Sequence, residues 1–154
     1  MQFDHKYWME IAISDLKCHS RESGNPDEVP ISALVVKDNV LISKAVNKVE
    51  SLNDCTAHAE MLAIREASEK LGNWRLNDCT LYTTLEPCAM CAGAIINSRL
   101  KKIIFGAYDL NAGACGSVIN LFSDLSKENQ IEMIGGILEL EAGKLLKDFF
   151  LVRR

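Results

Sequence analysis

The sequence lacks an excess of positive charge, an apolar signal segment and any apolar run long enough to cross a bilayer. Its 154 residues carry 17 Lys and Arg against 21 Asp and Glu, which gives a formal net charge of −4. A nucleic-acid partner would therefore need a local basic patch, because the overall charge offers no attraction. Without a signal segment or a membrane span, we expect a cytoplasmic protein that does not contact a membrane.

Internal repeats, low-complexity tracts and long linkers are also missing. The length suits one domain, so we expect residues 1–154 to fold as a single unit with its own core. Apolar residues make up 48% of the chain and charged residues 25%, as in soluble globular proteins. The six cysteines are Cys18, Cys55, Cys79, Cys88, Cys91 and Cys115. In a reducing compartment, closely spaced cysteines more often bind a metal or do chemistry than form disulfides.

Hydrophobic periodicity and turn residues predict helices that alternate with strands. The expected helices span about 4–20, 56–71, 88–98, 118–125 and 137–152, and the expected strands about 31–36, 40–46, 79–84, 102–105 and 130–134. The 88–98 helix is apolar almost all round, which predicts that it is buried. A glycine-rich loop is expected over 106–117. The alternation favours an α/β layered domain.

The most informative pattern combines HAE at 58–60 with PCAMC at 87–91. Cys88 and Cys91 are three residues apart, so they share a helix face and both sulfurs can reach one ion. Both lie in the first helical turn, where the helix N-terminus lowers thiol pKa values. His58 would add a third ligand. Three protein ligands leave zinc a fourth position for water, which is the catalytic arrangement.

Glu60 follows His58 by two residues and therefore does not share its helix face. It is badly placed to bind the metal and well placed to stand beside a bound water and shuttle protons. The alternative is a structural zinc site, which needs a fourth protein ligand, and Cys55 is the main candidate. Weaker candidates are His5, His19, Cys79 and Cys115. A structural site would leave Glu60 unexplained, whereas the combined pattern is typical of zinc deaminases.

Two longer runs, TAHAEMLAI at 56–64 and LYTTLEPCAMCAGA at 81–94, resemble the bacterial tRNA adenosine deaminases, the TadA family. The resemblance implies a cytidine-deaminase-like fold, a three-layer α/β/α arrangement around a five-stranded mixed sheet. It implies a homodimer that converts the wobble adenosine of a tRNA anticodon to inosine by hydrolysis. It also implies that His58, Cys88 and Cys91 bind zinc and that Glu60 is the general acid and base.

The resemblance further implies contacts with the anticodon stem-loop. These substrate-binding residues are Asn47, Asp109, Phe149, Phe150 and Arg153. Aromatic side chains beside arginine suit single-stranded RNA, because bases stack and phosphates need cations. The alternative for the C-terminal segment is a helix end packed on the core with a solvated basic tail. Asn47 could equally be a turn residue at the end of the hairpin.

Three functions remain open. The first is wobble-adenosine deamination, the second is deamination of a free nucleobase or nucleoside of the guanine or cytosine type, and the third is a zinc-stabilised binding module without catalysis. Family members often carry basic residues where this chain has Tyr108 and Asn111, which weakens the expected attraction for phosphates. The net charge favours the second function, whereas the aromatic C-terminus and the Asp109 loop favour the first.

Overall fold

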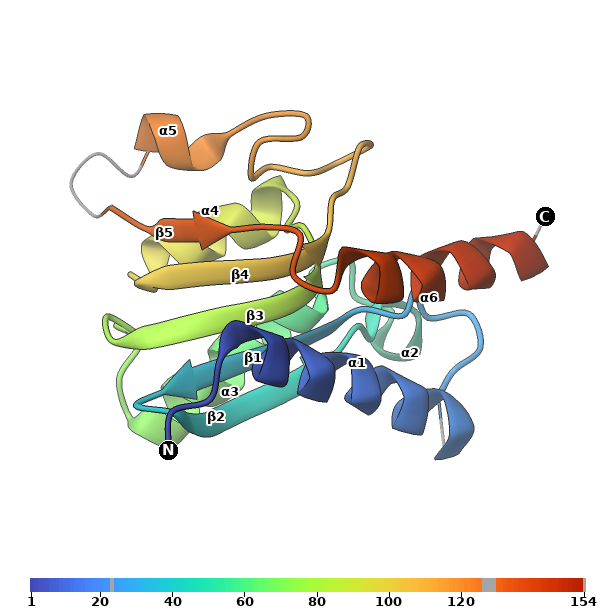
Figure 1. The fold of residues 1–154 in the computed structure, drawn as a ribbon, viewed down its shortest axis with the longest axis horizontal. Helices are drawn as coiled ribbons and strands as arrows, with labels where there is room; N and C mark the ends of the chain where they lie inside the picture. Colours follow the sequence, from blue (N-terminus) through green and yellow to red (C-terminus); the bar gives the residue numbers. More distant parts are fainter. Residues whose placement is uncertain (23, 126–129, 154) are drawn as a thin grey trace.

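The computed structural model describes residues 1–22, 24–125 and 130–153, and its strands form one mixed sheet in the order β2-β1-β3-β4-β5 (Figure 1). The strands are β1 (Ser32–Lys37), β2 (Val40–Val46), β3 (Cys79–Leu85), β4 (Lys102–Ala107) and β5 (Glu132–Ile134). β1 pairs antiparallel with both β2 and β3, while β3, β4 and β5 are mutually parallel. The expected five-stranded mixed sheet is confirmed.

Helices cover both faces of this sheet (Figure 1). They are α1 (His5–Glu22), α2 (Val49–Leu52), α3 (Ala59–Leu71), α4 (Ala89–Asn97), α5 (Leu121–Leu125) and α6 (Glu139–Val152). Side chains alternate across the sheet, so in β1 Leu34 packs in the core beneath α1 and α6 whereas Val35 packs in the core beneath α3 and α4. The expected three-layer α/β/α architecture is therefore confirmed. Among the described residues, no helix has the length and apolar character that a bilayer crossing requires.

The β1–β2 hairpin turns at Asp38 and Asn39, whose φ angles are 49° and 61°. Asp and Asn tolerate this left-handed region better than most residues, which is why the turn falls where the sequence predicts it. β4 continues to Ala107, two residues into the expected glycine-rich loop. Gly106 permits this, because a Cβ there would lie 2.8 Å from the carbonyl oxygen of Thr84 in the neighbouring strand.

The expected burial of the 88–98 helix is found on one face of α4 only. Within α4 only Cys91, Ala92 and Ile95 are buried, while Ala89 is exposed and Ile96 is partly exposed. Among the described residues, α4 buries one face in the core, while its other residues are half-buried or exposed. The helix composition alone does not show which of its residues the fold buries.

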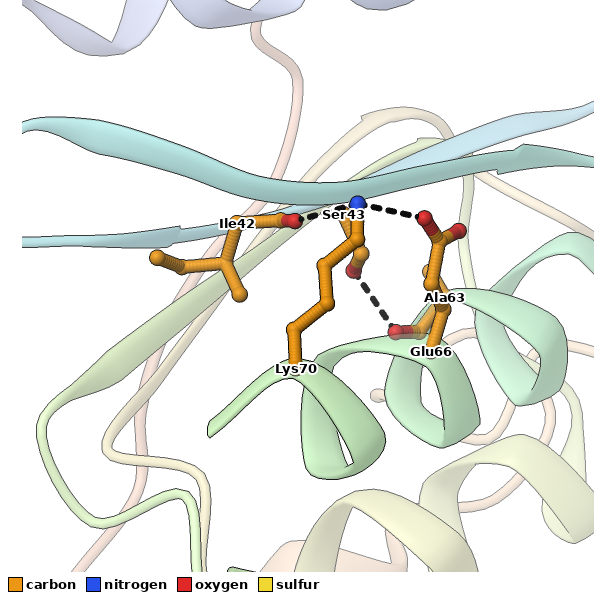
Figure 2. A network of polar contacts seen from close by, with 5 residues as sticks. All are labelled: Ile42, Ser43, Ala63, Glu66 and Lys70. Carbon is orange, nitrogen blue, oxygen red and sulfur yellow. Dashed lines mark hydrogen bonds and ion pairs between the residues drawn. The ribbon is translucent and has the colours of Figure 1, made fainter. Parts of the chain in front are cut away.

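A polar network fastens α3 to β2 (Figure 2). The Ser43 hydroxyl donates a hydrogen bond to the carbonyl oxygen of Ala63 at 2.7 Å, and both groups are buried. The Lys70 ammonium donates to the carbonyl oxygen of Ile42 at 3.0 Å and pairs with Glu66 at 2.6 Å. These contacts fix the axis of α3 on the sheet, and thereby the position of its N-terminus, where the HAE motif lies.

Candidate active site

The chemically distinctive residues meet at one edge of the sheet. β2, β3 and β4 point in the same direction, so their carboxyl ends lie along this edge. His58 is the N-cap residue of α3 and Cys88 the N-cap residue of α4, and neither side chain caps its own helix. Both side chains are therefore free to point away from the helix axes. A cavity of about 630 Å³ opens at this edge and is lined by both residues.

His58, Cys88 and Cys91 form a cluster in the described chain that could hold a metal ion. Their donor atoms all lie within 4.8 Å of one another. Nδ1 of His58 lies 3.7 Å from the Cys88 sulfur and 3.5 Å from the Cys91 sulfur. Two sulfurs and one imidazole nitrogen around a common point suit a borderline-soft ion such as zinc. The sequence correctly predicts that these three side chains come together.

Cys55 does not join this cluster. It is exposed at the surface and is not one of the residues whose donor atoms converge. The described residues therefore supply three side-chain donors, as the open arrangement of a catalytic site requires, and not the four of a closed structural site.

The two cysteines hold their protons differently. The hydrogen bond from Cys91 lowers the pKa of Cys88 to about 3, with a further contribution from His58. The same bond, together with burial, raises the pKa of Cys91 above its ordinary value. The hydrogen bond with Cys88 raises the pKa of His58. The expected effect of the helix N-terminus does not account for this difference, since the pKa of Cys91 is raised and the pKa of Cys88 is lowered by its hydrogen bonds. A metal bound here would displace the proton on Cys91.

Glu60 lies beside the cluster but outside it. The side chain is only 3% exposed and lines the cavity. Its Oε1 accepts a hydrogen bond from the Thr83 hydroxyl at 3.3 Å, and its Oε2 is buried with no hydrogen-bond partner among the described residues. Burial raises the pKa of this carboxyl group. An unsatisfied carboxylate oxygen is costly unless a ligand or water completes it, which makes Oε2 the natural position for proton transfer.

The structure brings some of the expected substrate residues to the cavity and leaves others outside it. Asn47, Asp109 and Phe150 line the cavity. Arg153 instead donates to the carbonyl oxygen of Phe149 at 3.2 Å and places its guanidinium 3.7 Å from the centre of that ring. Phe149, which is half-buried, and Arg153, which is exposed, therefore fit the alternative of a packed helix end with a solvated basic tail, while Phe150, 52% exposed, stands at the cavity rim.

Glu86 has a structural role that the sequence does not predict. Its side chain is 1% exposed and accepts four hydrogen bonds from the following loop. The donors are the backbone N–H groups of Asp109, Cys115 and Ser117 and the Ser117 hydroxyl. Gly113 packs directly on the carboxylate, where a Cβ would lie 2.5 Å from its Cδ atom. Residues 108–112 of this loop form one wall of the cavity.

Glu28 has a similar structural role at another wall of the cavity. It is 8% exposed and accepts the backbone N–H of Ser51 in the short α2 helix. It also accepts a hydrogen bond from the side-chain amide of Asn47 at 3.3 Å. α2 is absent from the sequence-based prediction, because four residues give no readable period. The Glu28 carboxylate accepts hydrogen bonds from residues that lie 19 and 23 positions further along the chain. The sequence alone does not show such contacts.

The cavity is acidic and largely free of basic groups. Five carboxylate side chains line it, namely Asp27, Glu50, Glu60, Glu86 and Asp109. No Lys or Arg is among the described residues of its lining. The remaining wall is mostly apolar, and Leu110 (79% exposed) and Tyr108 (46% exposed) lie at the rim. The arrangement can accept a flat, uncharged heterocycle beside a metal and a proton-carrying carboxylate.

Comparisons with known proteins agree with this chemistry. The model of the MafB19-like deaminase family matches residues 3–154. A tRNA-specific adenosine deaminase of Bacillus subtilis (strain 168) is 45% identical over 143 residues, which cover 93% of this chain and 86% of that protein. One of Aquifex aeolicus (strain VF5) is 43% identical over 145 residues and covers 94% of this chain and 93% of that protein.

Solved structures with the same fold include one from a study of A-to-I editing by tRNA:A34 deaminases at the wobble position. It matches with a TM-score of 0.83 and 37% identity and covers 92% of this chain and all of the other. The guanine deaminase of Bacillus subtilis matches with a TM-score of 0.62 and 38% identity over 69% of this chain and 66% of that one. The chain belongs to the MafB19-like deaminase family and to the group of deaminases that includes the bacterial tRNA-specific adenosine deaminases.

Proposed function

We propose that this protein hydrolyses the adenosine at the wobble position of a tRNA anticodon to inosine and ammonia. The observation that carries the proposal is the unpaired Oε2 of Glu60 beside the His58, Cys88 and Cys91 donors, at a cavity wide enough for a base. The names of the relatives support adenosine in tRNA as the substrate.

The donor set fits zinc, and His58, Cys88 and Cys91 would hold it. When bound, zinc supplies a Lewis acid that makes water acidic enough to be deprotonated near neutral pH. Glu60 would take one proton from water and pass it to the ring nitrogen as the oxygen adds to the carbon that bears the amine. It would then take the second proton from the new hydroxyl and pass it to the amine, which leaves as ammonia when the C–N bond breaks. Thr83 holds the other oxygen of Glu60, so that Oε2 keeps a fixed direction during the transfer.

An anticodon loop suits the entrance of the cavity. Its bases are unpaired, so inserting one costs less than extracting a base from a duplex. Phe150, Tyr108 and Leu110 present apolar surface at the rim, where neighbouring bases could stack. The acidic lining holds no described cation for a phosphate, so we expect the phosphates to be bound outside the cavity.

The second candidate is deamination of a free purine base such as guanine. The acidic, mostly apolar cavity favours an uncharged base without phosphate, and the structural likeness to a guanine deaminase supports the same idea. The two candidates share the metal centre and Glu60 and differ only in what fills the entrance.

Incubating the zinc-loaded protein with an anticodon stem-loop and, separately, with guanine distinguishes them. We expect inosine at the wobble position and ammonia release from the stem-loop, with no product from guanine. A matched stem-loop that carries guanosine at the wobble position is the control. Ammonia from guanine alone would replace the first proposal by the second, and no product from either would favour a binding module.

The homodimer implied by the resemblance and the cytoplasmic location expected from the sequence stay predictions. Light scattering on the purified protein measures the first, with twice the mass of the 17.1 kDa chain as the expected result.

A further inference from the structure

We infer that Glu28 is a positioning residue that fixes which end of the Asn47 amide faces the substrate, and that this end is the hydrogen-bond acceptor. The inference deepens the proposed function, on which it rests, by naming a determinant of substrate recognition in the same cavity. The observation behind it is the set of hydrogen-bond partners of the Asn47 side-chain amide.

The Asn47 side chain lies at the carboxyl end of β2, where its backbone N–H donates to the carbonyl oxygen of Ile31 at 3.0 Å. Its Nδ2 donates to Oε2 of Glu28 at 3.3 Å and to the carbonyl oxygen of Val29 at 3.4 Å. Both partners are oxygens that only accept. If the Asn47 amide were turned by 180°, its Oδ1 would face two oxygens that cannot donate. The observed orientation of the amide is therefore the favourable one.

Glu28 cannot easily turn away to release this constraint. It is 8% exposed, and its other oxygen, Oε1, accepts the backbone N–H of Ser51. The carboxylate thus joins the end of β2 to α2, which brings Val49 and Glu50 to the cavity wall. The same side chain that orients Asn47 also places the wall beside it.

The free end of the amide is Oδ1, and Asn47 lines the cavity. Nδ2 is held by Glu28 and Val29, so Oδ1 is the end of the amide that is left to meet a substrate. The substrate group that meets it must therefore be a donor, either a hydroxyl or an N–H. A substrate that offers only an acceptor at this point would face a repulsive contact.

Replacing Glu28 with Gln tests the orientation. The new side chain can keep an oxygen for the Ser51 N–H, but its NH2 group then faces Asn47 Nδ2, and the Asn47 amide must turn or lose its partner. On whichever substrate the wild-type protein deaminates, we expect KM to rise between a few-fold and about tenfold, as for the loss of one hydrogen bond. We expect kcat to change less than about twofold, because the reacting centre is untouched.

A double-mutant cycle separates this role from a general structural one. Glu28→Gln should raise KM in the wild-type background and have no further effect in an Asn47→Ala background. Glu69→Gln, which removes an exposed carboxylate on α3, is the charge control and should change neither constant. An equal effect of Glu28→Gln in both backgrounds, or none in the wild type, would overturn the inference.

Exchanging the carboxylate and the amide between positions 28 and 47 should restore substrate binding. Asn47→Asp alone places two carboxylates together and should bind substrate poorly. Adding Glu28→Gln supplies a donor to the introduced carboxylate, which still presents an acceptor to the cavity, so KM should return toward the wild-type value. A double variant no better than Asn47→Asp would contradict the pairing.

A measurement without substrate keeps the inference separate from the proposed function. In ¹⁵N NMR spectra, the side-chain NH2 of Asn47 should exchange its protons more slowly in the wild type than in Glu28→Gln, because only the wild type has the bond to the Glu28 carboxylate. Equal exchange rates would overturn the inference even if the protein deaminates tRNA. Slower exchange in the wild type would support it even if tRNA is not the substrate.

Discussion

Replacing Glu86 with Gln should destabilise the protein far more than the loss of an exposed carboxylate does. Oε1 of Glu86 accepts the N–H groups of Cys115 and Ser117 at 3.1 and 3.0 Å, and Oε2 accepts the N–H of Asp109 at 2.9 Å and the Ser117 hydroxyl. A glutamine keeps one oxygen for the first pair and turns an NH2 group toward the second. The Ser117 hydroxyl can rotate and accept a hydrogen bond from this NH2 group, but the Asp109 N–H can only donate and loses its acceptor.

The expected loss follows from these contacts. An unsatisfied buried donor costs about 1–3 kcal/mol, and each retained bond loses about 1 kcal/mol when its acceptor becomes neutral. Since a neutral amide is also cheaper to bury, we expect the free energy of unfolding to fall by about 3 kcal/mol. For a chain of 154 residues this corresponds to a decrease in Tm of roughly 6–12 °C.

Urea unfolding of the zinc-loaded protein, followed by circular dichroism, measures this difference. Glu132→Gln is the matched control, because that carboxylate is 57% exposed and pairs with Lys102 at 3.0 Å. An exposed pair of this kind contributes less than about 1 kcal/mol. If Glu86→Gln lost no more stability than Glu132→Gln, the idea that Glu86 organises the 108–117 wall would be refuted.

Three further predictions concern the loop, the metal and the core. Gly113→Ala should lower stability by more than 1 kcal/mol in the same urea assay because its Cβ would overlap Glu86. Gly93→Ala in α4, where a Cβ meets nothing within 4 Å, should be neutral or stabilising. Cys91→Ser should lose bound zinc by elemental analysis while Cys55→Ser keeps it, and loss of zinc from Cys55→Ser would revive the structural-site alternative. Burial raises the pKa of Tyr82 to about 12 from 10.0. The folded state therefore holds this proton more tightly, so stability should fall as pH rises from 10 to 12, and Tyr82→Phe should show a shallower fall.

Local patterns predict much of the fold. The β1–β2 hairpin follows from an Asp-Asn turn between two apolar runs, and the end of α3 follows from Gly72, which adopts φ = 63°. The same is true of the metal cluster, because the spacing of Cys88 and Cys91 brings both sulfurs to one end of α4. A structural feature that depends on a few neighbouring residues can therefore be predicted from the sequence.

Features that depend on distant partners could not be predicted. Glu28 and Glu86 look like ordinary surface carboxylates in the sequence, yet each is buried by segments 19 or more residues away. α2 is held by Glu28, which accepts the backbone N–H of Ser51, and it ends at Asn53, which adopts the left-handed region with φ = 48°. The exposed side of α4 likewise depends on which neighbours the fold supplies.

The most direct test of the account is the inosine yield of a Glu60→Gln variant that retains its zinc, measured on an anticodon stem-loop against the wild type. Because Glu60 stands outside the donor cluster and alone offers an unpaired buried carboxylate oxygen there among the described residues, we predict that the rate falls by at least a hundredfold. A zinc-loaded variant that forms inosine at the wild-type rate would contradict the account.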